Sequence, residues 1–317
     1  MEQTFYYIII GALIFEYVLS TLSSVLNMNS IVEDIPSGFE NYYDHKKYAR
    51  SQLYLKDKTL FGLFSSTFSL LVVLFIIHRG LFGDLDYLVS EYNDNHILRG
   101  LMFFGILFFI NDIINIPFSL YSTFVIEEKY GFNKTTIKTY VLDKLKGYGL
   151  TVVLGSLIMS PILYFFNAYN TNGWLIAWGI ITGFMIAVQP LFVHVIAPMF
   201  NKFTSLEKGE LRSAIESFSD KVNFPIGRID VMDGSRRSAH SNAYFSGFGK
   251  SRRIALFDTL LDKHTTEEIV SVVAHEVGHY KKKHVITGTI LGILETGLML
   301  YIFNLLMNNQ ALFDVFG

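Results

Sequence analysis

The chain has 317 residues, of which 51% are hydrophobic and 15% aromatic, and its mean hydropathy is +0.36. A composition this apolar excludes an ordinary soluble domain and indicates a membrane protein. The net charge of -2 lacks the basic field on which nucleic-acid binding depends, so nucleic acid is excluded as a partner. The absence of cysteine excludes disulfides and thiolate ligands, so a transition metal would need histidine and carboxylate ligands.

Six apolar stretches are long enough to cross a bilayer, which takes about 20 residues as a helix. They cover residues 5–26, 60–78, 98–120, 149–166, 174–197 and 285–307. The first stretch has neither a basic leading region nor a small-residue cleavage site, so it is expected to remain as a span. The predicted fold class is therefore an all-α, multi-pass membrane protein with six spans in this chain.

The distribution of Lys and Arg predicts the orientation of these spans, because both residues concentrate in cytoplasmic loops. Loops 27–59 and 121–148 hold five each, whereas loop 79–97 holds one and loop 167–173 holds none. Segment 198–284 carries fourteen of the 26 Lys and Arg residues. The two basic loops and this segment are expected to face the cytoplasm, and the other two loops the opposite side.

Three parts follow along the chain. Residues 1–197 would form five spans with their loops, residues 198–284 a small α+β segment, and residues 285–317 the sixth span with a short tail. The patterning of the middle part predicts an amphipathic helix near 206–222, strands at 228–232, 242–245 and 253–257, and a Gly-rich turn at 246–250.

One motif in the middle part carries chemistry. Thr265 with Glu268 forms a capping-box signature, which predicts a helix through the run His-Glu-Val-Gly-His. On a helix, His275 and His279 share a face and can bind one Zn²⁺, while Glu276 stands beside the open coordination position. The metal would acidify a water and polarise a scissile carbonyl, and Glu276 would pass the water proton to the leaving amine. The alternative is a helix with surface histidines.

Zinc hydrolases of this kind use a third protein ligand, and no good candidate is evident. Glu295 lies sixteen residues past His279, inside the sixth predicted span. His284, at i+5 of a continuous helix, would point away from the zinc-binding face. His240 and His284 both stay open as candidates. On the residues alone, either the site or the chain is incomplete.

The His-Glu-Val-Gly-His run at 275–279, together with four further runs of sequence, resembles the type I CAAX prenyl endopeptidases. The runs are residues 124–133, 196–204, 233–248 and 253–261. The resemblance implies seven membrane helices around a large water-filled chamber, of which this chain would hold six. It implies a zincin-like site on the cytoplasmic side that removes the last three residues from prenylated C-terminal peptides. The third zinc ligand would be a glutamate beyond a further span, so the resemblance places it beyond Gly317.

The resemblance also implies that residues 241–245 form the active-site edge strand. An extended peptide can add to such a strand by β-augmentation, so Asn242 and Ala243 are predicted to contact the substrate backbone. A plain hairpin strand is the alternative.

The predicted function is thus a zinc metalloendopeptidase embedded in a membrane, cleaving a peptide or protein, lipidated or not, near its C terminus. A membrane-protein quality-control protease is one alternative. A catalytically silent scaffold or transporter is another, favoured by the intramembrane acids Glu16, Asp112 and Glu295 and by the incomplete ligand set.

Membrane lipids are expected partners. The basic run Lys281–Lys283 could meet lipid headgroups or a substrate carboxylate, and a positive-inside anchor is the alternative. The short stretch between Leu261 and His275 resembles bacterial members of the family, so the bacterial inner membrane is predicted in preference to the endoplasmic reticulum.

Overall fold

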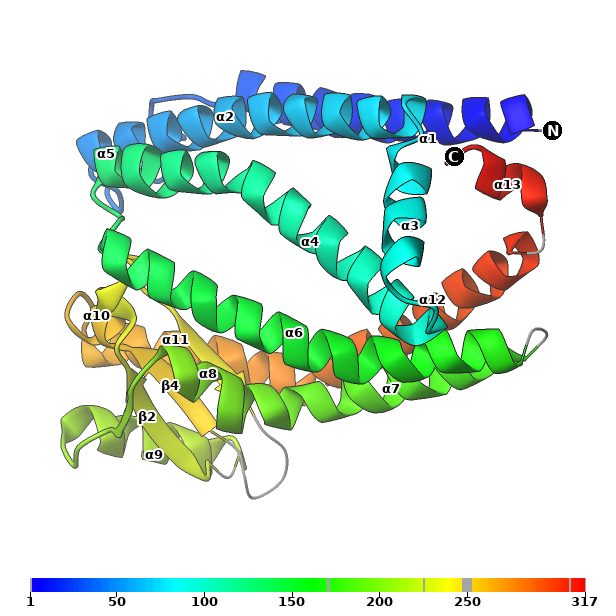
Figure 1. Ribbon diagram of the computed structural model, residues 1–317. Helices are drawn as coiled ribbons and strands as arrows, with labels where there is room; N and C mark the ends of the chain where they lie inside the picture. The colour runs from blue at the N-terminus through cyan, green and yellow to red at the C-terminus, as the bar shows by residue number, and fades with distance from the viewer. Residues whose placement is uncertain (1, 170–171, 225, 247–252, 308, 317) are drawn as a thin grey trace. The chain divides into compact units, whose positions relative to one another are not determined.

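The protein is described by a computed structural model that covers residues 2–169, 172–224, 226–246, 253–307 and 309–316 (Figure 1). The chain divides into two compact units. One unit comprises Met1–Gly131 together with Phe303–Gly317, and the other comprises Phe132–Ile302.

The regular elements of the first unit are all helices in the residues that the structure describes. Its elements are α1 (Glu2–Asn29), α2 (His45–His78), α3 (Leu81–Tyr92), α4 (His96–Tyr121), the π-helical segment η1 (Ser122–Glu127), α5 (Glu128–Tyr130) and α13 (Gln310–Asp314). Helices α1 and α2 lie side by side (Figure 1), and the hydroxyls of Tyr17 and Thr67 are 2.6 Å apart between them. The side chain of Asp44 caps α2 by accepting a hydrogen bond from the backbone N–H of Lys47.

The second unit combines three long helices with a small α+β part. Its elements are α6 (Ile137–Ala168), α7 (Gly173–Leu191), η2 (Phe192–Ile196), α8 (Ala197–Phe200), β1 (Phe203–Ser205), α9 (Glu210–Lys221), β2 (Arg228–Met232), η3 (Gly234–Arg236), β3 (Ala243–Ser246), β4 (Arg253–Phe257), α10 (Asp258–Leu261), α11 (Thr266–Lys281) and α12 (His284–Leu306). Helices α6 and α7 run together (Figure 1). Trp178 of α7 donates a hydrogen bond to the carbonyl of Ile293 in α12, at 2.8 Å. A Cβ atom at Gly297 would lie only 2.8 Å from the same indole, so this glycine permits the close packing of α7 and α12.

The four-stranded sheet has the order β1-β2-β4-β3. Strands β2 and β4 are parallel, and the two outer strands pair antiparallel with them. Helices α9 and α11 pack on the sheet through a core that includes Ile215, Ile254, Leu256 and Val273, all fully buried. The outer position of β3 leaves one of its edges without a partner strand in the described part of the chain.

Among the described residues, six helical segments are long and apolar enough to span a membrane, as the sequence predicts. They are Gln3–Asn29, His45–His78, His96–Tyr130, Ile137–Ala168, Gly173–Phe200 and His284–Leu306. At most 11% of each apolar window is buried inside the protein, which leaves the apolar side chains free to face lipid. The predicted all-α membrane architecture with a small α+β segment is therefore confirmed.

Several predicted loops are shorter than expected. Residues 45–59 of loop 27–59 belong to α2, most of loop 79–97 is the helix α3, and loop 121–148 reduces to the connection between Tyr130 and Ile137. The reason is that hydropathy marks only the apolar part of a helix. Polar residues with good helix propensity continue the helix beyond that part.

In the α+β segment, the strands at 228–232 and 253–257 have the predicted bounds, and β3 begins one residue later than predicted. The helix predicted at 206–222 begins only at Glu210, because residues 206–209 form the approach from β1 and the extended Gly209 precedes the first turn. The turn predicted at 246–250 falls mostly outside the described residues.

Candidate metal centre

Helix α11 carries the His-Glu-Val-Gly-His run, and its first turn is fixed by the predicted capping box. The hydroxyl of Thr265 accepts from the backbone N–H of Glu268, and the Glu268 carboxylate accepts from the backbone N–H of Thr265 at 2.9 Å. The Thr265 N–H and the His264 ring hold the pKa of the Glu268 carboxyl below its usual value. One face of α11, with Ile269 and Val273, is buried against the sheet, which leaves the opposite face for chemistry.

His275 and His279 meet on that free face. Their Nε2 atoms lie 3.0 Å apart, and both rings are exposed. A tetrahedral zinc with Zn–N bonds of about 2.0–2.1 Å holds neighbouring ligand nitrogens about 3.3 Å apart, so the two rings fit two positions of one such ion. Glu276 is half-buried beside them, and its carboxylate has no hydrogen-bond or ion-pair partner in the described part of the chain. The Glu276 carboxylate would therefore be free to accept a proton from a water bound between it and the two imidazoles.

The prediction that His284 points away from this site is wrong. Its Nδ1 atom lies 2.9 Å from Nδ1 of His279. The prediction assumed one continuous helix, but Lys283 has a positive φ of 57°, which ends α11 and starts α12 in a new direction. His284 therefore contacts the ring nitrogen of His279 that faces away from His275.

The two other candidates for a third ligand are not brought to the histidine pair. The ring of His240 stacks on Phe132, with centroids 4.1 Å apart. Glu295 lies within α12. Among the residues that the structure describes, no group of three His, Asp or Glu side chains could hold a metal ion. The third ligand beyond Gly317 stays a prediction.

Strand β3, which has the free edge of the sheet, contacts helix α11. The carbonyl of Asn242 accepts from the Phe257 N–H at 3.0 Å, so the backbone of Asn242 is committed to β4. Antiparallel pairing alternates, which directs the backbone groups of Ala243 and Phe245 to the unpaired side. The Asn242 side chain accepts from the Ala243 N–H at 2.9 Å, which leaves the Ala243 carbonyl open to a peptide.

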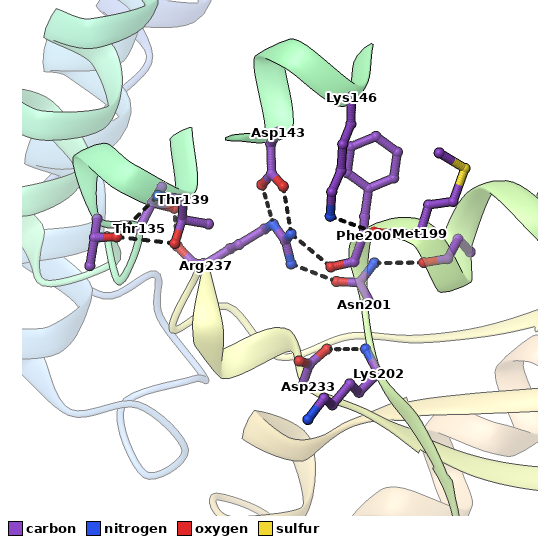
Figure 2. A network of polar contacts seen from close by, with 12 residues as sticks. Thr135, Thr139, Asp143, Lys146, Met199, Phe200, Asn201, Lys202, Asp233 and Arg237 are labelled. Atoms are coloured by element: carbon purple, nitrogen blue, oxygen red, sulfur yellow. Dashed lines mark hydrogen bonds and ion pairs between the residues drawn. The ribbon is translucent and has the colours of Figure 1, made fainter. Parts of the chain in front are cut away.

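The segment that leads into β3 is anchored by Arg237, as Figure 2 shows. Its guanidinium donates two hydrogen bonds to Asp143 of α6, at 2.7 and 3.0 Å, and further bonds to the Asn201 side chain and the Phe200 carbonyl. The side chains of Arg237 and Asp143 are each only 23% exposed. The Arg237 carbonyl in turn accepts from the Lys134 N–H at 3.0 Å. Reasoning from single residues missed this anchor, and only the resemblance over 233–248 could have indicated it.

Two family models match successive parts of the chain. The model described as CAAX prenyl protease N-terminal, five membrane helices, matches residues 24–202, and the model described as peptidase family M48 matches residues 205–317. The chain belongs to the CAAX prenyl proteases of peptidase family M48. This family is one of metallopeptidases, which agrees with the pair of convergent imidazoles on α11.

Similar M48 proteins come from yeasts and from human. CAAX prenyl protease 1 of Saccharomyces cerevisiae is 37% identical over 89% of this chain and 65% of its own length. A probable CAAX prenyl protease 1 of Schizosaccharomyces pombe is 37% identical over 90% of this chain and 63% of its own length, and a human homologue is 30% identical over 89% and 69%. This chain thus spans less than two thirds of the length of the two yeast proteins.

A solved structure is similar throughout. The crystal structure of S. mikatae Ste24p matches with a TM-score of 0.87 at 34% identity, over 94% of this chain and 72% of that one. Like the family match, it supports a multi-pass integral membrane protein. The two yeast relatives and the human one are eukaryotic, and they lend no support to the predicted bacterial inner membrane.

Proposed function

We propose that this M48 protein is a zinc metalloendopeptidase that cleaves a peptide bond near the C terminus of its substrate. The observation that carries the proposal is the approach of the His275 and His279 Nε2 atoms to 3.0 Å on a capped helix that runs beside a free strand edge. Two neutral imidazoles at this spacing suit zinc. As a Lewis acid, zinc would lower the pKa of a bound water and polarise the scissile carbonyl.

Glu276 is the proposed general base and acid. Its carboxylate is free of other partners in the described structure, so it can take the proton of the attacking water. The same carboxyl group then donates that proton to the leaving amine as the C–N bond breaks. Both transfers use one residue because the water and the amine occupy neighbouring positions at the same carbonyl.

Asn242 and Ala243 are proposed to align the substrate. An extended peptide can add to the edge of β3 through the backbone of Ala243 and Phe245, whose polar groups face the unpaired side. Asn242 would contribute through its side-chain amide, because its backbone is already bonded to β4. The register in which the substrate peptide pairs with β3 then determines which of its peptide bonds lies beside Glu276.

His284 is proposed to position His279. A neutral imidazole carries one ring proton, so an N–H on Nδ1 of His279 that bonds to His284 leaves Nε2 free for the metal. Metal-bound histidines commonly donate a hydrogen bond from the N–H of their second ring nitrogen, which fixes the tautomer and the ring orientation.

The names of the relatives extend the proposal to the substrate class. Proteins called CAAX prenyl protease support a C-terminal, prenylated peptide as substrate. The Lys and Arg distribution supports a cytoplasmic position for residues 198–284. Membership of a peptidase family favours this function over a silent scaffold or transporter, and the relatives' names favour it over general quality control.

Substitution of Glu276 by Gln tests the proposed chemistry. Glu276→Gln should keep zinc, because Glu276 is not a ligand, and should lower cleavage of a quenched prenylated peptide by at least about 100-fold. His275→Ala should lose both zinc and cleavage. Wild-type turnover by Glu276→Gln would refute the role of Glu276, and unchanged zinc content in His275→Ala would refute the metal centre.

A further inference from the structure

A cavity of about 690 Å³ lies where two membrane-length helices meet the sheet in the second unit. It is separate from the proposed zinc ligands, since His275, Glu276 and His279 do not line it. Its walls come from the end of α7, the first two residues of η2, the beginning of α12, the end of α11 and strand β3. The volume falls within the range of about 300–1,000 Å³ that is typical of ligand sites.

The lining of this cavity is amphipathic. Phe192, Phe245, Tyr280 and Val285 contribute apolar walls, and Phe245 and Tyr280 pack edge to face with ring centroids 5.4 Å apart. Burial raises the pKa of the lining Tyr244 hydroxyl, so that side chain stays uncharged. An occupant would need a substantial apolar part.

Two cations stand at the same cavity. Lys281 and Lys283 line it, both are exposed, and neither has an ion-pair partner in the described part of the chain. Lys283 also has a φ of 57°, a left-handed conformation that glycine adopts at much lower cost. Asn223, with a φ of 49°, lines the cavity too, so both non-glycine residues of positive φ among the described residues are found here. Strained backbone of this kind gathers at ligand sites.

We propose that this cavity binds one anionic phospholipid of the surrounding bilayer. An acyl chain would fill the apolar part, and the phosphate would pair with Lys281 and Lys283. Val285 and Ile286, at the beginning of the span His284–Leu306, line one side of the cavity, which places that side at headgroup level. The residues that line it from the span Gly173–Phe200 lie between Val188 and Val193, seven or more residues before the end of that span. The leaflet with the anionic lipids is the cytoplasmic one, the side to which the Lys and Arg distribution assigns residues 198–284.

The chain offers a matched set of variants for the charged part of the site. Lys283→Gly removes one cation and relieves the left-handed backbone, so lost binding cannot be ascribed to misfolding. Lys282→Ala removes the same charge from a neighbouring lysine that does not line the cavity. The purified chain is mixed in neutral detergent with phosphatidylglycerol or with phosphatidylcholine of the same acyl chains. Bound lipid is then counted by native mass spectrometry.

Phosphatidylglycerol is expected to bind the wild type more tightly than phosphatidylcholine. Lys283→Gly should weaken phosphatidylglycerol binding about fivefold, the effect of one lysine near a charged headgroup, and should weaken phosphatidylcholine binding less, because choline offsets the charge of that lipid's phosphate. Lys282→Ala should behave as wild type. An equal loss in Lys282→Ala, or equal binding of the two lipids, would overturn the proposal.

The apolar part is tested by filling the cavity. Val285→Trp places an indole in its wall and should lower the binding of both lipids, while circular dichroism shows the wild-type helix content. Undiminished binding of both lipids in Val285→Trp would place the lipid elsewhere and overturn the proposal. A second result would also overturn the proposal: a prenylated peptide displaces phosphatidylglycerol from the wild type, and Val285→Trp no longer binds that peptide. The cavity would then be part of the substrate site.

Discussion

The ring of His279 lies between two other imidazoles, with His275 at its Nε2 side and His284 at its Nδ1 side. The two neighbours have different consequences. In the proposed centre, His275 would bind the same metal ion as His279, and His284 would fix which nitrogen of His279 carries the proton. The residue types alone could not reveal the second contact, because it depends on the positive φ of Lys283.

Substitution of His284 should therefore weaken zinc binding without removing a ligand. His284→Ala is expected to lower zinc affinity about 10- to 100-fold, measured by competition with a chromophoric chelator. His284→Asn should restore most of the loss, because an amide oxygen can accept the proton of His279 Nδ1. The control is His264→Ala, which removes a histidine that pairs with Glu268 at the start of α11. Equal losses in His284→Ala and His284→Asn would argue against the positioning role.

At the scale of elements, Arg237 joins the approach to β3 to helix α6. Arg237→Lys keeps the charge but cannot form the two parallel bonds to Asp143. The variant is expected to lower the free energy of unfolding by about 2 kcal/mol. Thermal denaturation in detergent measures this loss. Because the anchored segment leads into the substrate edge, KM should rise more than kcat falls.

Arg236→Lys is the matched control for this variant. Arg236 precedes Arg237 in the same loop but is exposed, and its side chain has no partner in the described structure. It should leave both stability and KM at wild-type values. A fall in kcat with an unchanged KM in Arg237→Lys would contradict the assignment of Arg237 to substrate alignment.

Elements with a strong local signal could be predicted from the sequence. The six spans follow from apolar length, and α11 follows from its capping box. Strand β1 has only three residues, Phe203–Ser205, too few for an alternating pattern to show. The π-helical segments η1 and η2 continue apolar helices without a change in composition, so hydropathy cannot separate them.

The candidate metal centre was predictable only in part for a related reason. The histidine pair depends on spacing within one helix, which the sequence contains directly. The contacts of Arg237 with Asp143 and of His284 with His279 depend on how separate elements are packed or on a backbone angle between them. No local sequence pattern indicates either of these two contacts.

For the whole molecule, the predicted orientation can be tested because the chain has no cysteine. Ser205→Cys, exposed in β1, should react with a membrane-impermeant maleimide only after the cells are permeabilised. Asp94→Cys, exposed between α3 and α4, should react in intact cells. The reverse pattern would invert the topology and would place the proposed metal centre outside the cytoplasm.

The junction between α11 and α12 gives the site a mechanical link to its membrane. Only Lys282 and Lys283 separate the two helices, so α12 follows directly on the helix that carries the proposed metal ligands. With 23 residues, α12 is about 35 Å long, more than the hydrocarbon thickness of about 30 Å, and a helix that is too long tilts. Since His284 is the first residue of α12, tilting would shift it against His279. Bilayer thickness is thereby expected to influence the contact between His284 and His279, and with it the metal affinity of the proposed centre.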